Sequence, residues 1–180
     1  MIKIIKYFLQ AFVIYFFFII TKLIGLKLSR NFFSYLFNKI GPFIRSNQVI
    51  DENLDKFMGN YNPELKENIK TEMWSSYAKT FVEYIYLKKF RKKNDIVKTK
   101  GEEILQKIIK KNKPVIFVSG HFANFELMSM ELTKRNIKLA TIYRPLNNFF
   151  INPVMEHVRR KYVCKNQIKK GIAGVKSAIK

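Results

Sequence analysis

The feature that most constrains this chain is an apolar run near its N-terminus, residues 7–20, which reads YFLQAFVIYFFFII. Gln10 is its only strongly polar member, so the run must be buried either in a protein core or in a lipid bilayer. Extended to Leu26, it comes close to the roughly 20 apolar residues that a membrane-spanning helix needs. The small-residue cleavage site that ends a secretory signal peptide does not follow it.

Basic residues flank this run on both sides, and no acidic residue precedes Asp51. The larger basic group follows the run, which predicts that the body of the protein is cytoplasmic. A helix that lies in the bilayer interface fits nearly as well as one that spans the bilayer, and a buried helix of a soluble protein is the alternative. We predict a membrane anchor over residues 1–45, with a second, amphipathic helix over residues 28–43 that ends at Gly41-Pro42.

The charge of the chain is strongly unbalanced. It has 34 Lys and Arg against 13 Asp and Glu, a formal net charge of +21. A field of this size favours anionic partners, namely nucleic acid, anionic lipid or acidic proteins, although a lysine-rich genome is an alternative cause. No nucleic-acid-binding motif is present, so we expect an anionic membrane surface and no nucleic acid. One cysteine, Cys164, and two histidines make a disulfide framework impossible and a zinc site poor, and we expect neither metal nor cofactor.

Residues 46–180 predict a layered α/β unit. An aromatic-rich helix over residues 62–90 is followed by a basic segment, residues 88–100, which is either a solvated linker or a docking patch. Helices and short apolar runs then alternate, a pattern typical of parallel strands in a layered sheet. The expected elements are helices at 102–111, 125–134 and 149–161 and strands at 115–118 and 138–143.

The candidate catalytic residues follow the first expected strand. His121 lies three residues after it, and Glu126 follows five residues later. In a parallel sheet, ligands bind beyond the carboxyl ends of the strands, and Arg144 directly follows the second strand, which places it at the same edge. A histidine with a carboxylate partner can take a proton from a hydroxyl group that attacks a carbonyl.

The spacing of this pair restricts how it can work. On one continuous helix, positions i and i+5 lie about 140° apart, so the side chains would diverge. The pairing therefore requires His121 in a loop and a helix that starts near Asn124, a good N-cap, with Glu126 in its first turn. The alternative is an ordinary loop histidine beside a capping acid.

At this point the sequence resembles a known family. GHFANFE, residues 120–126, is similar to the HX4E motif of the bacterial lipid A biosynthesis acyltransferases, the lauroyl and myristoyl transferases. Residues 143–148, YRPLNN, resemble a second element of that family, and Arg159 falls where the family carries an arginine. The apolar leader and the segment MWSSYAKTFVEY, residues 73–84, also fit, so that the resemblance covers nearly the whole chain.

The resemblance implies transfer of a fatty acyl group from an acyl carrier protein thioester to a hydroxyl of a phosphorylated lipid A precursor. His121 and Glu126 would then be catalytic, and Arg144 and Arg159 would bind anionic groups of the acceptor or the oxyanion. Asn148 and Asn124 would orient these groups. The enzyme would act at the cytoplasmic side of the bacterial inner membrane.

The resemblance also implies a longer protein. Members of the family continue well beyond residue 180, so we expect the α/β unit to be incomplete at its C-terminus and these 180 residues to be inactive alone. Two other functions are alternatives: an acyltransferase that acts on a lysophospholipid or glycolipid, and a noncatalytic basic protein attached to the membrane. The sequence does not indicate the acyl chain length or which hydroxyl is acylated.

Overall fold

The computed structural model describes all residues except 60–61, 94–95, 173, 175 and 177–180. The chain divides into two units, one formed by Met1–Tyr15 with Tyr86–Lys180 and the other by Phe16–Ile85. Helix α1 (Ile2–Ile24) contributes to both units. The predicted boundary at residue 45 stays a prediction.

The unit Phe16–Ile85 is helical. It contains α2 (Leu26–Ile44), α3 (Asn47–Met58) and α4 (Pro63–Glu83). Phe33 on α2 is fully buried, and its ring packs edge-on against Phe17 with centroids 5.3 Å apart. Packing between these aromatic rings therefore contributes to the core of this unit.

The prediction that the second helix ends at Gly41-Pro42 was wrong. Helix α2 continues to Ile44, and Pro42 lies inside it. Pro42 lacks the N–H group that would bond to the carbonyl four residues before it, so the end of α2 has one helical hydrogen bond fewer. Gly41 is buried, and the indole of Trp74 occupies the space where a side chain at this position would lie. The glycine therefore permits close helix packing instead of ending the helix.

The helix predicted over residues 62–90 is interrupted. Helix α4 ends at Glu83, a 3-10 turn η1 (Tyr84–Tyr86) follows, and α5 (Leu87–Lys92) continues the chain. The start is as predicted, because Asn62 Oδ1 accepts a hydrogen bond from Glu64 N at 2.9 Å. The first residues of the predicted basic linker are therefore helical.

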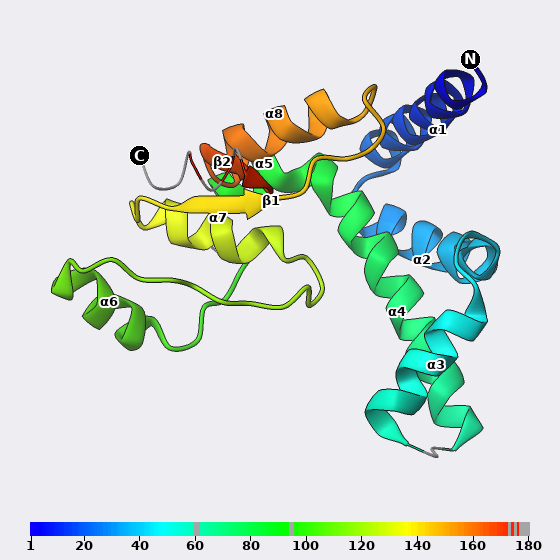
Figure 1. Cartoon of the computed structure of the whole chain (residues 1–180), viewed down its shortest axis with the longest axis horizontal. Helices are drawn as coiled ribbons and strands as arrows, with labels where there is room; N and C mark the ends of the chain where they lie inside the picture. The colour runs from blue at the N-terminus through cyan, green and yellow to red at the C-terminus, as the bar shows by residue number, and fades with distance from the viewer. Residues whose placement is uncertain (60–61, 94–95, 173, 175, 177–180) are drawn as a thin grey trace. The chain divides into compact units, whose positions relative to one another are not determined.

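The second unit carries the α/β part. It contains α6 (Glu102–Lys111), α7 (Glu126–Lys134), β1 (Ala140–Tyr143), α8 (Asn152–Tyr162) and β2 (Asn166–Lys169). The two strands pair in parallel, with Ala140 opposite Asn166 and Tyr143 opposite Lys169. Helices α7 and α8 lie on opposite sides of the strands (Figure 1). The α/β fold class is thus confirmed, in a mostly helical form.

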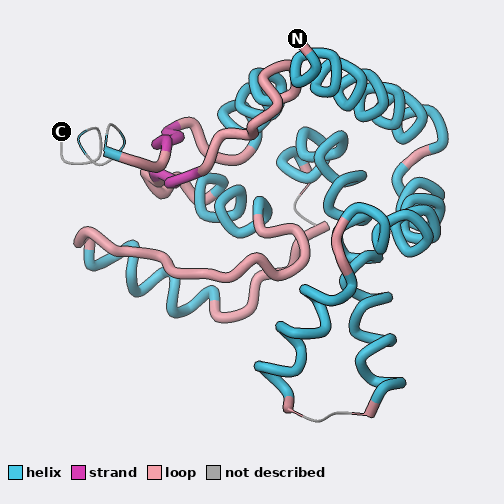
Figure 2. Tube along the Cα trace, turned by 45° about the vertical axis from the view of Figure 1, so that its right-hand side comes forward, coloured by secondary structure: helices cyan, strands magenta, loops and turns pink. Residues whose placement is uncertain are grey.

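The strand predicted at residues 115–118 is not formed. The segment between α6 and α7 is a loop along its whole length (Figure 2). Ile116 is 89% exposed and Val118 is 90% exposed. A short apolar run indicates that a segment tends to be buried, but a strand also needs a neighbouring backbone with which to form hydrogen bonds.

Candidate active site

The candidate site is built around the start of α7. The helix begins at Glu126, and the side chain of Asn124 accepts a hydrogen bond from Glu126 N at 3.2 Å. Asn124 is 8% exposed and Glu126 is 6% exposed, so both are buried. Asparagine forms this contact readily because its short side chain reaches a free N–H group of the first turn. The predicted helix start near Asn124 and the predicted place of Glu126 in the first turn are confirmed.

Glu126 is paired with Arg159 of α8. Arg159 Nε donates to Glu126 Oε1 at 2.6 Å, and the two side chains are 15% and 8% exposed. A buried carboxylate needs hydrogen-bond partners that offset its lost hydration, and Arg159 provides one. This ion pair joins the helix before β1 to the helix after it. The family resemblance implied that Arg159 binds the acceptor or the oxyanion, and it did not pair Arg159 with Glu126.

His121 lies in the loop that precedes α7, as predicted. Its imidazole is exposed and packs against Phe125, with ring centroids 4.4 Å apart. The imidazole of His121 is therefore open to a ligand. Glu126, five residues further along the chain, has its carboxylate held by Arg159. The direct pairing of His121 with Glu126 stays a prediction.

The backbone between His121 and Glu126 is strained. Ala123 has a φ of 45°, in the left-handed region that alanine rarely adopts. This conformation costs roughly 1–2 kcal/mol for a residue with a Cβ atom. Strain of this kind is concentrated at functional sites, where surrounding structure imposes it. Sequence analysis missed Ala123, because alanine carries no signal for a positive φ.

Arg144 occupies the predicted position directly after β1. Its side chain is exposed. The parallel ladder continues at this end of the sheet, since Lys170 N donates to Tyr143 O at 2.9 Å. Burial raises the pKa of Tyr143, and the negative charge of Glu156 raises it further, so the phenol stays protonated at neutral pH.

Asn148 contacts helix α1. Its Nδ2 donates to the carbonyl oxygen of Tyr7 at 2.8 Å, and its Oδ1 accepts from Phe150 N at 3.0 Å. Asn148 is 8% exposed. The structure therefore brings together Asn124, Glu126 and Arg159, while Asn148 is held against the apolar helix.

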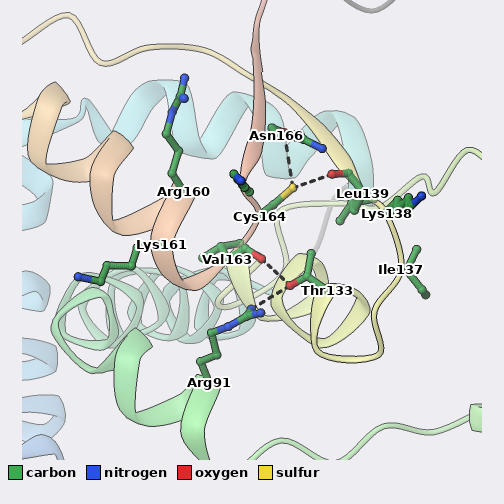
Figure 3. Close-up of a pocket in the computed structure, with 11 residues that line it drawn as sticks. Arg91, Thr133, Ile137, Lys138, Leu139, Arg160, Lys161, Val163, Cys164 and Asn166 are labelled. Atoms are coloured by element: carbon green, nitrogen blue, oxygen red, sulfur yellow. Dashed lines mark hydrogen bonds between the residues drawn. The ribbon is translucent and has the colours of Figure 1, made fainter.

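A cavity of about 340 Å³ lies at the other end of the strands (Figure 3). It is bounded by the segments that lead into β1 and β2 and by the last turn of α8. Thr133 Oγ1 donates to Val163 O at 2.7 Å, and the buried Cys164 donates its thiol to Leu139 O at 3.1 Å. The first contact joins α7 to the end of α8, and the second joins the segments that lead into β1 and β2. The cavity lies away from the candidate catalytic residues, and no sequence pattern indicated it.

Metal-binding groups are few. Among the residues that the structure describes, no three His, Cys, Asp or Glu side chains come together as a metal ion would require. Within the same residues, α1 alone is long and apolar enough to cross a membrane. Buried core helices and signal sequences share that property.

The apolar N-terminal helix, the α/β unit and the HX4E segment at the start of α7 agree with the acyltransferase resemblance. The comparison with protein families identifies the family itself. The chain matches the bacterial lipid A biosynthesis acyltransferases over residues 1–180 and belongs to that family. Searches of curated proteins and of solved structures gave no significant match.

Proposed function

We propose that this protein transfers a fatty acyl group from an acyl carrier protein thioester to a hydroxyl of a phosphorylated lipid A precursor. Membership of an acyltransferase family of lipid A biosynthesis supports the class of reaction. One observation supports the site: an exposed imidazole stands at the start of a helix whose first carboxylate is buried against a guanidinium. The identity of the acyl donor and that of the acceptor are part of this proposal.

His121 is the proposed general base. One imidazole nitrogen takes the proton of the acceptor hydroxyl as its oxygen attacks the thioester carbonyl. The tetrahedral intermediate then collapses, the carbon–sulfur bond breaks, and the imidazolium returns the proton to the leaving thiolate. The products are an ester and a free carrier thiol, and no covalent enzyme intermediate forms.

Glu126 is the proposed partner of the imidazolium. A negative carboxylate near the ring stabilises the positive charge that the ring gains in the transition state. Arg159 holds that carboxylate in place through its ion pair. Hydrogen bonds of catalytic groups are often long before substrate binds, and the proposal requires His121 to approach Glu126 in the complex.

Arg144 is the proposed contact for anionic groups of the acceptor. It is exposed at the carboxyl end of β1, where ligands of parallel sheets bind. A guanidinium binds phosphate oxygens through two parallel hydrogen bonds. Contacts of Arg159, Asn124 and Asn148 with the substrate stay predictions. The basic surface suits both an acidic carrier protein and an anionic inner membrane, with the site on the cytoplasmic side.

The test measures acyl transfer in the complete protein that carries these residues, with an acyl carrier protein thioester and a phosphorylated lipid A precursor. We expect His121→Ala and Glu126→Ala each to lower the rate by about 10²–10⁴-fold, the usual contribution of a general base, with membrane association unchanged. His157→Ala is the matched control, because His157 is exposed on α8. Full activity in His121→Ala would overturn the assignment.

Two further arms decide between the alternatives. A lysophospholipid or glycolipid replaces the lipid A precursor in the first, and faster transfer to it would assign a different acceptor. In the second, residues 1–180 are assayed alone, and we expect no transfer. Transfer by residues 1–180 would contradict that expectation.

A further inference from the structure

The loop between β1 and α8, residues 144–151, is bound to the first half of α1. Asn148 Nδ2 donates to Tyr7 O at 2.8 Å, and the hydroxyl of Tyr15 donates to Phe150 O at 2.7 Å. Positions 7 and 15 lie about two turns apart on the same side of a helix. The loop is therefore fixed to α1 at two separated points, and it cannot move along the helix without breaking both.

Between these points α1 approaches the loop closely. Ala11, midway along the same stripe, is 3% exposed. A small side chain at this position leaves room for the neighbouring backbone, as small residues do where helices pack in membranes. The rings of Tyr7 and Phe149 lie 5.8 Å apart, and those of Phe8 and Phe150 lie 5.7 Å apart.

The outer surface of this assembly is apolar. On α1, Phe8 is 55% exposed and Phe12 is 65% exposed; on the loop, Leu146 is 42% exposed and Phe149 is 51% exposed. The ring contacts of Tyr7 with Phe149 and of Phe8 with Phe150 join the exposed apolar area of the helix to that of the loop. Exposed apolar area of this kind marks an interaction site.

Cations border the same surface. Lys3 extends its ammonium group over the ring of Tyr7, 5.7 Å from the centroid, and Arg144 stands exposed at the start of the loop. Apolar rings with cations at their margin suit the boundary between anionic head groups and acyl chains. The net charge of +21 favours the same partner.

We propose that the loop 144–151 enters the interface of an anionic bilayer together with α1, and that Asn148 is the positioning residue that couples them. Phe149 and Leu146 then lie at the acyl boundary, and Arg144 lies at the level of the phosphate groups. The depth of the loop in the bilayer is then determined by the depth of α1, to which the loop is bound. This inference requires lipid binding and does not depend on acyl transfer.

Spin labels on introduced cysteines test the depth of each segment in vesicles. The labels are placed at Phe149, at Phe12 of α1 and at Lys107 of α6, in vesicles with and without phosphatidylglycerol; the native Cys164 is buried. In anionic vesicles, we expect the labels at 149 and 12 to be more accessible to oxygen than to a water-soluble nickel complex, and the label at 107 to show the reverse. A label at 149 that stays in water while the label at 12 is embedded would overturn the proposal.

The coupling is tested by Asn148→Asp. This change keeps an oxygen for Phe150 N but removes the group that donates to Tyr7 O. Asn147→Asp adds the same charge at the exposed neighbouring position and is the matched control. We expect Asn148→Asp alone to return the label at 149 to water while the label at 12 stays embedded.

A milder variant guards against misfolding. Tyr15→Phe removes only the hydroxyl that donates to Phe150 O. We expect the label at 149 to become partly accessible to the water-soluble nickel complex in this variant. Continued protection of Cys164 from thiol reagents confirms that each variant is folded. Equal depth at 149 in the wild-type protein, Asn148→Asp and Tyr15→Phe would show that the loop is not held by α1 and would refute the coupling.

Discussion

The ion pair between Glu126 and Arg159 gives the sharpest prediction for stability. In Arg159→Ala the carboxylate of Glu126, whose side chain is 8% exposed, loses the guanidinium that holds it. Removing one partner of a buried ion pair costs about 3–5 kcal/mol, because a buried charge is left without compensation. Arg159 is still 15% exposed, so water reaches its side of the pair and the lower value, about 3 kcal/mol, applies.

A loss of this size is measurable by thermal unfolding in detergent micelles, followed by circular dichroism. For a chain of this length each 1 kcal/mol lowers the Tm by about 2–4 °C, so Arg159→Ala should lower it by about 6–12 °C. Arg160→Ala is the matched control, because Arg160 is 51% exposed and its pair with Glu156 is on the surface. Exposed pairs contribute about 0–1 kcal/mol.

A double variant separates the charge from the contact. Adding Glu126→Gln to Arg159→Ala removes the buried charge, so we expect the double variant to be more stable than Arg159→Ala by about 1–2 kcal/mol. If the Tm of Arg159→Ala fell within about 2 °C of that of Arg160→Ala, the pair would contribute no more than a surface pair, and the reasoning would be refuted.

Three further predictions concern other parts of the fold. Ala123→Gly should raise stability by up to about 1 kcal/mol, because glycine adopts the φ of 45° without strain; an unchanged or lower Tm would contradict this. Gly41→Ala should cost about 1–3 kcal/mol, because the new methyl group displaces the indole of Trp74, and the emission of this single tryptophan should shift; emission identical to wild type would count against it. Burial works to raise the pKa of Glu131, but hydrogen bonds from Arg135 and the neighbouring lysine lower it below its usual value. Its contribution is therefore present above about pH 4.5 and lost as the pH falls through the lowered pKa, so Glu131→Gln should flatten the fall in Tm between about pH 5 and pH 3; an unchanged acid slope would show that other groups dominate.

Local signals in the sequence predicted the helices well. The bounds expected for α6 are those observed, because two acids open this helix and two lysines close it. The start of α7 was expected near Asn124; Phe125 holds the cap position, and the side chain of Asn124 accepts a hydrogen bond from Glu126 N. Signals of this kind act within one turn and therefore depend little on the rest of the chain.

Features that depend on distant partners could not be predicted in the same way. Residues 115–118 have the composition of a buried strand, but a strand exists only where another backbone lies beside it. The pairing of Glu126 with Arg159 joins residues 33 positions apart, and that of Asn148 with Tyr7 joins residues 141 positions apart. Spacing says nothing about such contacts, so the sequence indicated candidate residues but not their partners.

Because residues 115–118 do not form a strand, the candidate residues need another reason to be expected in one site. Their proximity was expected because two adjacent parallel strands would end at the same edge, one before His121 and one before Arg144. The structure offers a different link: Glu126 opens the helix before β1, and Arg159 lies in the last turn of the helix after it. The ion pair thus joins the helices on the two sides of the sheet independently of any third strand. If removing Arg159 lowers the rate of acyl transfer even in a variant that lacks the charge of Arg144, the link between α7 and α8 organises the site. If only the removal of Arg144 lowers the rate, the edge of the sheet organises the site.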